Sequence, residues 1–132
     1  MKLQLTVNDK RVAARLIDGP AARDFMALLP LTLTMNDLFK REKFGHLPRA
    51  ISTDGKHTHA YALGEIAYWP PGPDVAVFYR HDGEAIPDPG IIVIGKVTSG
   101  LGAFDVRGAV KVRFELPEEV AEPVAVISPT ET

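Results

Sequence analysis

The segment from Asp18 to Pro30, DGPAARDFMALLP, constrains the fold most because it is the one stretch with a complete set of helix signals. Asp18 or Gly19 can cap the free backbone amides at the start of a helix. Pro20 suits the first helical position, where its missing N–H would have had no partner, and Pro30 ends the run. These signals predict one helix over about residues 19–29.

One face of this predicted helix is apolar. The apolar residues that recur at helical spacing are Ala22, Phe25, Met26 and Leu29. A helix with one apolar face must cover a broad apolar surface, which in a strand-rich chain is a sheet or the open end of a barrel. The neighbouring charges Arg23 and Asp24 do not face each other on a helix, and we expect them to fasten it to a nearby loop.

Most of the remaining chain shows strand and turn signals. Alternating or continuous apolar residues predict strands within residues 3–7, 12–16, 31–35, 66–69, 75–79, 91–97 and 106–116. Eleven glycines and eleven prolines mark many turns, including the rigid turn at Pro70–Pro73. Residues 37–63 are the least regular part, and we expect a short helical segment near residues 37–44. The pattern is mainly β, and the last strand is expected to close the sheet.

Composition narrows the function classes. A chain of 132 residues favours one domain, and 17 acidic against 15 basic residues with no basic block favour neither nucleic acid nor an anionic membrane as a partner. No apolar run approaches the ~20 residues of a membrane span, and the start lacks a signal-peptide core, so we expect a soluble cytoplasmic protein. There is no cysteine for disulfides or thiolate sites. Motifs for hydrolases and nucleotide binding are absent from the sequence.

The chain changes character after Leu116. Residues 117–132 combine proline, glutamate and small residues, which predicts a C-terminal tail after a domain over residues 1–116. Within the tail, Val124–Ile127 could add a strand to a neighbouring edge. An oligomeric interaction or regulatory module, which forms a homodimer through this tail or through an edge strand, is therefore the third hypothesis.

Three groups of phrases resemble the cyclophilin fold, and specifically the bacterial stand-alone cyclophilin-like domains that have no assigned activity. RVAARLIDGPAARDFMALL, which begins at Arg11, is similar to the cyclophilin strand and first helix, with Ala22 and Phe25 under the barrel. IGKVTSGL, from Ile94 to Leu101, resembles the Gly-Lys/Arg-Val-x-x-Gly turn. ARDFMALLPLTLTMNDL, LPRAISTDG and GEIAYWPPGPDVAVFY are similar to the bacterial branch. The resemblance spans most of residues 3–116.

This resemblance implies a closed cyclophilin-like β-barrel of about eight strands, with helices over its ends and a shallow external cleft. In cyclophilins an arginine in that cleft hydrogen-bonds the prolyl nitrogen and lowers the ~20 kcal/mol barrier to peptide-bond rotation. The Phe-His-Arg and Phe-x-x-Gln-Gly-Gly phrases that supply the arginine and glutamine are absent here. Where cyclophilins have Ser-Gln-Phe-Phe, this chain has Val77-Phe78-Tyr79. A peptidyl-prolyl isomerase with a rearranged site is therefore the second hypothesis rather than the first.

The first hypothesis is a protein that binds a peptide or small molecule in an external cleft, with no catalytic residue, cofactor or metal assigned. The ligand-binding candidates are Arg49, Tyr68, Trp69, Phe78 and Tyr79. Alternation along a strand directs Tyr68 and Trp69 to opposite faces, and likewise Phe78 and Tyr79. One residue of each pair is expected in the core and the other outside, but alternation does not decide which.

Histidines offer one alternative site. His57 and His59 are two residues apart beside Asp54, a spacing that suits a metal site if His46 or His81 supplies a third ligand. A polar surface loop with unrelated histidines explains the same pattern, and we favour that interpretation. The acid-base run that begins at His81 is interpreted in the same way.

Overall fold

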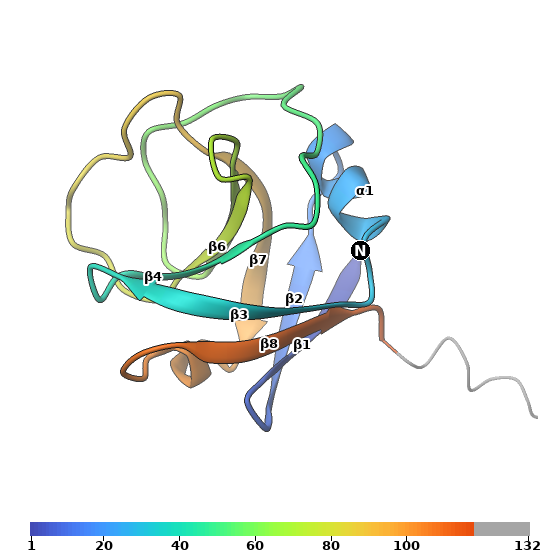
Figure 1. Ribbon diagram of the computed structural model, residues 1–132, viewed down its shortest axis with the longest axis vertical. Helices are drawn as coiled ribbons and strands as arrows, with labels where there is room; N and C mark the ends of the chain where they lie inside the picture. Colours follow the sequence, from blue (N-terminus) through green and yellow to red (C-terminus); the bar gives the residue numbers. More distant parts are fainter. Residues whose placement is uncertain (118–132) are drawn as a thin grey trace, which may run out of the picture.

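Antiparallel pairing closes the chain into a barrel. The computed structural model describes residues 1–117. Its strands are β1 (Lys2–Val7), β2 (Lys10–Leu16), β3 (Leu31–Leu38), β4 (Glu42–His46), β5 (Glu65–Trp69), β6 (Asp74–Phe78), β7 (Ile92–Ser99) and β8 (Val110–Glu115). They follow one another around the barrel in the order β1-β2-β7-β5-β6-β4-β3-β8 (Figure 1). β8 pairs with both β1 and β3, so the prediction of a closed barrel of about eight strands is confirmed.

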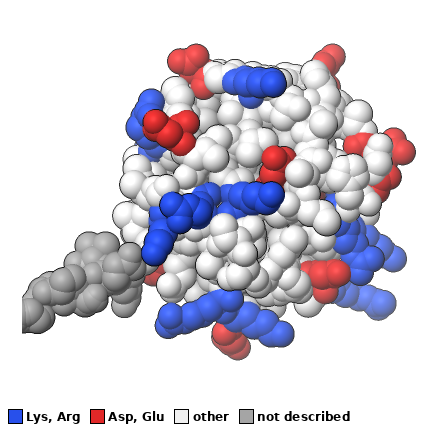
Figure 2. All heavy atoms as spheres, turned by 180° about the vertical axis from the view of Figure 1, so that it is seen from behind, with Lys and Arg blue, Asp and Glu red and all other residues white. Residues whose placement is uncertain are grey.

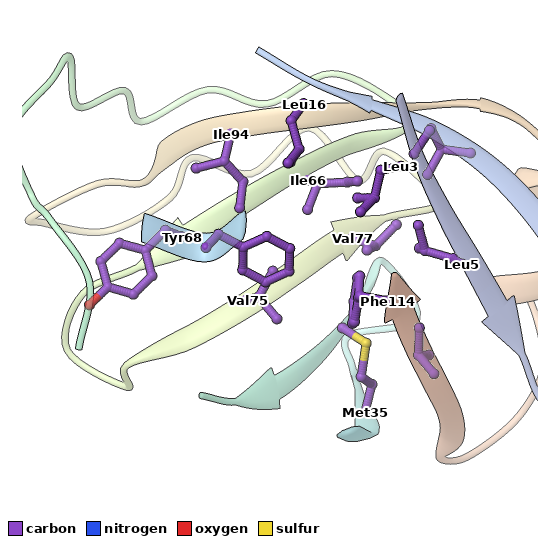
Figure 3. Packing of buried hydrophobic residues seen from close by; sticks show 14 of the residues in the cluster. Leu3, Leu5, Leu16, Met35, Ile66, Tyr68, Val75, Val77, Ile94 and Phe114 are labelled. Atoms are coloured by element: carbon purple, nitrogen blue, oxygen red, sulfur yellow. The ribbon is translucent and has the colours of Figure 1, made fainter. Parts of the chain in front are cut away.

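The barrel interior is filled by the alternate side chains that the sequence pattern predicted. On β1 the inward residues are Leu3, Leu5 and Val7, each at most 2% exposed. Leu5 lies opposite Phe114 of β8, and Figure 3 shows these side chains converging with those of β3, β5, β6 and β7. The polar residues between them face outward, as the period of a strand requires.

The helix α1 (Pro20–Met26) is shorter than the predicted 19–29, because the turns after Met26 tighten to i→i+3 hydrogen bonds. Gly19 is its N-cap residue, with no side-chain cap. Phe25 is fully buried and packs edge-to-face on Phe114, with ring centroids 5.4 Å apart. Asp24 accepts a hydrogen bond from the backbone N–H of Ser52 at 2.8 Å, so it fastens the helix to the loop after β4.

The predicted helical segment near residues 37–44 is wrong. β3 continues to Leu38, a tight turn follows, and β4 runs back beside β3 from Glu42. The turn residues Phe39 and Lys40 have positive φ angles of 57° and 53°. Two consecutive residues with positive φ form a turn whose twist matches that of the two strands of a hairpin. This turn explains why the chain reverses direction here although the segment contains no glycine.

Lys43 holds this hairpin against the rest of the barrel. Its side chain is completely buried, and Nζ donates to Asp37 at 3.1 Å and to the backbone carbonyls of Val106 and Gly108 at 2.6 and 2.5 Å. Asp37 also accepts a hydrogen bond from the Tyr79 hydroxyl. Burial alone would raise the pKa of Asp37, but the hydrogen bonds from Tyr79 and Lys43 outweigh it and lower the pKa.

The remaining helical element is the short 3₁₀ turn η1 (Leu101–Phe104), which places Phe104 in the core. Among residues 1–117, no helix has the length and apolar character needed to cross a membrane. The predictions about the C-terminal tail, including a strand at Val124–Ile127, concern residues outside this range.

Replacing Asp37 with asparagine is expected to lower stability by about 1–3 kcal/mol at pH 7, because Lys43 and Tyr79 lose a charged partner. The folded-state pKa of Asp37 lies below its unfolded value of about 3.9. Its ionised form therefore stabilises the fold above about pH 4, and this contribution is lost as the pH falls through the folded-state pKa. The stability difference between wild type and Asp37→Asn should accordingly shrink on acidification.

Urea unfolding of both proteins between pH 7 and pH 3 measures this difference. Asp54→Asn is the matched control, since Asp54 is an exposed loop carboxylate. A gap between wild type and Asp37→Asn that is equally large at pH 3 and pH 7 would contradict the assignment.

Candidate functional site

The four aromatic candidates divide between the two sides of the barrel wall. Tyr68 and Tyr79 belong to the interior core and are 1% and 7% exposed. The Tyr68 hydroxyl accepts a hydrogen bond from the backbone N–H of Ile51 at 3.2 Å, and the Tyr79 hydroxyl donates to Asp37. Trp69 and Phe78 lie on the outer side. One residue of each pair thus faces outward, whereas Tyr68 and Tyr79 are placed away from any external cleft.

A second, smaller apolar cluster covers the outer side of β5 and β6. Its buried members are Tyr61, Ala67, Ala76, Phe78, Ile86 and Ile91. The ring of Tyr61 stacks on Phe78 at 4.3 Å, and His81 stacks on Tyr61 at the same distance. Residues from the loops on either side of β5 and β6 therefore enclose part of the outer wall and leave a cleft beside it.

This aromatic cleft has a volume of about 200 Å³ and opens on the outer side of β4, β6 and β5. Its walls include Phe39, Arg41, Glu42, Phe44, Trp69, Asp74 and Phe78. Phe44 and Glu42 are two residues apart on β4 and so share one face, while Lys43 between them points to the opposite side. Strand alternation thus brings a carboxylate to an aromatic cleft.

Arg41 and Glu42 form a buried ion pair at the edge of the cleft. Their residues are 5% and 7% exposed, and Arg41 donates from Nε to Glu42 Oε1 at 2.9 Å and from Nη2 to the same oxygen. The guanidinium carbon lies 5.3 Å from the ring centroids of both Phe39 and Tyr61, within range of a cation–π interaction. Nη1 lies 3.5 Å from Asp82 Oδ2.

Glu42 lines the cleft, and its second carboxylate oxygen, Oε2, differs from the first in its partners. Every hydrogen bond of this side chain within residues 1–117 goes to Oε1, yet no fully buried side-chain oxygen in that part of the chain lacks a partner. Oε2 is therefore not fully buried, although the Glu42 side chain is only 9% exposed. Burial raises the pKa of Glu42, although the ion pair with Arg41 opposes the rise. The cleft thus offers an open hydrogen-bonding group inside an aromatic wall.

Phe39 stands at the mouth of the cleft in an unfavourable backbone conformation. Its φ angle is 57°, a region that costs a bulky residue about 1–3 kcal/mol. Its side chain is nonetheless 70% exposed, so core packing does not account for a phenylalanine here. The hairpin turn accounts for the positive φ, which Lys40 shares, so it is the exposed ring beside the cleft that makes Phe39 a candidate ligand contact.

Arg49 does not join this cleft. It is exposed in the loop after β4, and its side chain makes no hydrogen bond or ion pair with the rest of residues 1–117. Arg41 is the arginine that borders the aromatic cleft instead. The sequence reasoning missed Arg41 and Glu42 because it treated residues 37–44 as helical. A strand interpretation, with Glu42 and Phe44 on one face, would have found them.

The histidine cluster does not assemble. His59 contacts Asp88 at 2.7 Å, His46 contacts Asp74 at 3.2 Å, and His57 lies near the backbone carbonyls of Thr53 and Pro89. Nowhere in residues 1–117 do three or more metal-ligating side chains come together.

A larger hollow of about 630 Å³ lies between the start of α1 and residues 54–62. Its charged residues, among them Asp18, Asp54 and Lys56, are exposed at the rim. We favour the aromatic cleft as the candidate site, because a buried ion pair and an exposed aromatic residue meet there.

The comparisons agree with this architecture. A model of the cyclophilin-like family matches residues 5–115. The solution structure of the hypothetical protein AF2241 from Archaeoglobus fulgidus is similar with a TM-score of 0.69 at 21% identity, covering 87% of this chain and 93% of that one. At this identity the likeness shows the fold alone. A search of curated proteins found no match. Because the family model spans most of its length, the chain belongs to the cyclophilin-like family.

Proposed function

We propose that this protein binds a peptide through the aromatic cleft, which takes one apolar side chain while Glu42 accepts a hydrogen bond from a neighbouring N–H of the ligand. The observation that carries this proposal is the open Oε2 of a buried glutamate within aromatic walls. Apolar walls with few convergent polar groups are the usual composition of a ligand site.

The size of the cleft supports a side chain rather than a large small molecule. Its volume of about 200 Å³ falls below the ~300–1,000 Å³ of sites that enclose drug-sized ligands. A proline or an aliphatic side chain suits such a space, with the rest of the peptide lying across the surface. The exposed ring of Phe39 would then cover the inserted side chain.

The charges support an uncharged ligand segment. Arg41 neutralises Glu42 within the pair, and the other charged residue of the cleft, Asp74, is a carboxylate, so the cleft offers no unpaired positive charge to an anionic ligand. An ionised carboxylate oxygen is a strong acceptor for a backbone N–H. A peptide amide meets this requirement without bringing a charge into an apolar site.

The same geometry argues against prolyl isomerisation. Nε and Nη2 of Arg41 are engaged by Glu42, and Nη1 is directed to Asp82. Two carboxylates therefore compete with a prolyl nitrogen for this guanidinium. Membership of the cyclophilin-like family is the observation that favours isomerisation, and we keep it as the second candidate function.

Replacing Phe39 with glycine is expected to weaken peptide binding while leaving the fold at least as stable, because glycine adopts positive φ without strain. Lys40→Gly is the matched control. Its φ of 53° is relieved in the same way, but no cleft aromatic is lost. We expect Phe39→Gly to reduce affinity about five- to tenfold, the effect of losing about 1–1.4 kcal/mol of contact energy.

The single tryptophan of the chain, Trp69, lies in the cleft and reports binding by its fluorescence. The probes are N-acetylated Ala-Ala-Xaa-Ala amides in which Xaa is proline, leucine or lysine. The proposal is supported if the proline or leucine peptide quenches the fluorescence, with an affinity that falls about five- to tenfold in Phe39→Gly and is unchanged in Lys40→Gly. No response to any peptide, or equal loss in both variants, would overturn it.

The isomerase candidate is tested with a protease-coupled assay on Xaa-Pro nitroanilide peptides. We expect wild-type protein to leave the rate of cis-trans conversion at its uncatalysed value, since Glu42 and Asp82 compete with the substrate for Arg41. Acceleration that disappears in Arg41→Ala or in Arg49→Ala would establish the isomerase instead, and would identify the arginine responsible.

A further inference from the structure

A second surface, on other strands than the aromatic cleft, gathers positive charge. We call it the basic face, and its exposed outward residues on β1, β2, β7 and β8 are Lys2, Arg11, Arg15, Lys96, Lys111 and Arg113. In the view from behind, Figure 2 shows Lys and Arg side chains gathered over the middle and lower part of one face. Within residues 1–117 only Arg113 among these six has an ion-pair partner, Glu115 at 3.2 Å.

Strand register brings like charges side by side on this face. Lys2 of β1 lies opposite Arg15 of β2, and Arg15 lies opposite Lys96 of β7. Neighbouring strands are only about 4.8 Å apart, and like charges directly opposite one another destabilise a sheet. Glu65 is the next residue in the row, but its carboxylate accepts a hydrogen bond from the backbone of Ala62. Such a row is relieved by an anion that binds across it.

The basic face is also hollowed. A depression of about 370 Å³ is lined by Lys2, Arg11 and Arg15 among others, and it is bordered by Pro117. Pro117 is the last residue that the structure describes. The chain therefore continues from the rim of this depression.

The continuation has the complementary charge. Four of the 17 acidic residues of the protein, and none of its 15 basic residues, follow Pro117. Residues 1–117 consequently carry two more basic than acidic residues, while the whole chain carries two fewer. The first three of these acids, Glu118, Glu119 and Glu122, come within five residues of the depression.

We propose that the acidic segment after Pro117 binds the basic face of its own barrel, with Glu118, Glu119 and Glu122 near Lys2, Arg11 and Arg15. An extended chain spans at most about 3.3–3.6 Å per residue, so residues 118–122 reach about 17 Å. Arg11 and Arg15 are about 13 Å apart along β2 at strand spacing. Covalent attachment at the rim keeps the effective concentration of the acids high, so a few ion pairs suffice for docking.

Nucleic acid is the main competing occupant. The outer positions of β1, β2, β7 and β8 carry no aromatic residue on which an unpaired base could stack. The acidic segment, in contrast, is part of the chain and begins at the site. We therefore assign the face to this segment, which shields it from other polyanions.

The test measures how fast individual lysines are acetylated by acetic anhydride, using mass spectrometry of the full chain at low ionic strength. In the variant Glu118→Gln/Glu119→Gln/Glu122→Gln we expect Lys2 and Lys96 to react about fourfold faster than in wild type, which corresponds to a docked fraction of about three quarters. Lys56, outside the basic face, should react equally in both. At 1 M salt the difference should vanish, because ion pairs at the surface are screened.

A matched control removes the same number of negative charges elsewhere. Asp54, Glu84 and Asp88 are exposed loop residues outside the basic face. The variant Asp54→Asn/Glu84→Gln/Asp88→Asn should leave the reactivity of Lys2 and Lys96 at the wild-type value. A similar increase in this control would assign the effect to net charge and overturn the proposal.

Three further outcomes would also overturn it. If the acetylation rate of Lys2 is the same in the wild type and in the tail variant, the acidic segment does not cover the basic face. Protection that grows with protein concentration, together with a dimer in light scattering, assigns the segment to a second copy instead. Finally, a labelled single-stranded DNA 20-mer could bind the wild type and the tail variant equally tightly. That result would show that the acidic segment does not cover the basic face in the wild type.

Discussion

Burial of charge at the start of β4 is the constraint on which both the barrel wall and the cleft depend. Arg41, Glu42 and Lys43 are consecutive, and each is at most 7% exposed. A buried charge costs several kcal/mol unless it is paired and hydrogen-bonded. Because side chains alternate along the strand, Glu42 lies on the outer side, where it pairs with Arg41. Lys43 lies on the other side, where it donates hydrogen bonds to Asp37 and to two backbone carbonyls. One short segment thereby fixes the hairpin and equips the cleft.

The elements that the sequence predicted well are those whose hydrophobic pattern has one interpretation. The first hairpin, the strands on either side of Pro70–Pro73 and the anchor Phe25 all follow from apolar spacing and turn residues. The prediction of a helical segment at residues 37–44 was wrong because consecutive charged residues are normally exposed. An exposed run of charged residues is compatible with a helix as well as with a strand. Only tertiary partners distant in sequence, such as Val106 and Gly108 for Lys43, make burial of these charges favourable.

The candidate site could be predicted only in part, because hydrophobic spacing does not show which residues pack together in the folded chain. Alternation established that one residue of each aromatic pair faces outward, but choosing Trp69 and Phe78 required the loops that pack over them. Arg49 was chosen because it follows a proline in an irregular stretch, whereas Arg41 was hidden in the misassigned segment. The basic face could not be seen in composition, because its cations are spread along the sequence and meet only through strand register.

Strand register therefore determines which side chains lie on the aromatic cleft and on the basic face. It also determines which of these positions can be substituted without disturbing the barrel. A slip of one residue in any strand would exchange its inner and outer side chains, exposing the core and dispersing the cations of the basic face. In a closed barrel each strand is held by two neighbours, so such a slip cannot be confined to one side. The rim of the cleft is built differently. Phe39 lies in a turn and Ile86 in a loop, where substitutions do not disturb the ladder. If the cleft binds a peptide as proposed, its preference can change through the loops, whereas the positions of the cations on the basic face are tied to the strands and hence to the fold itself.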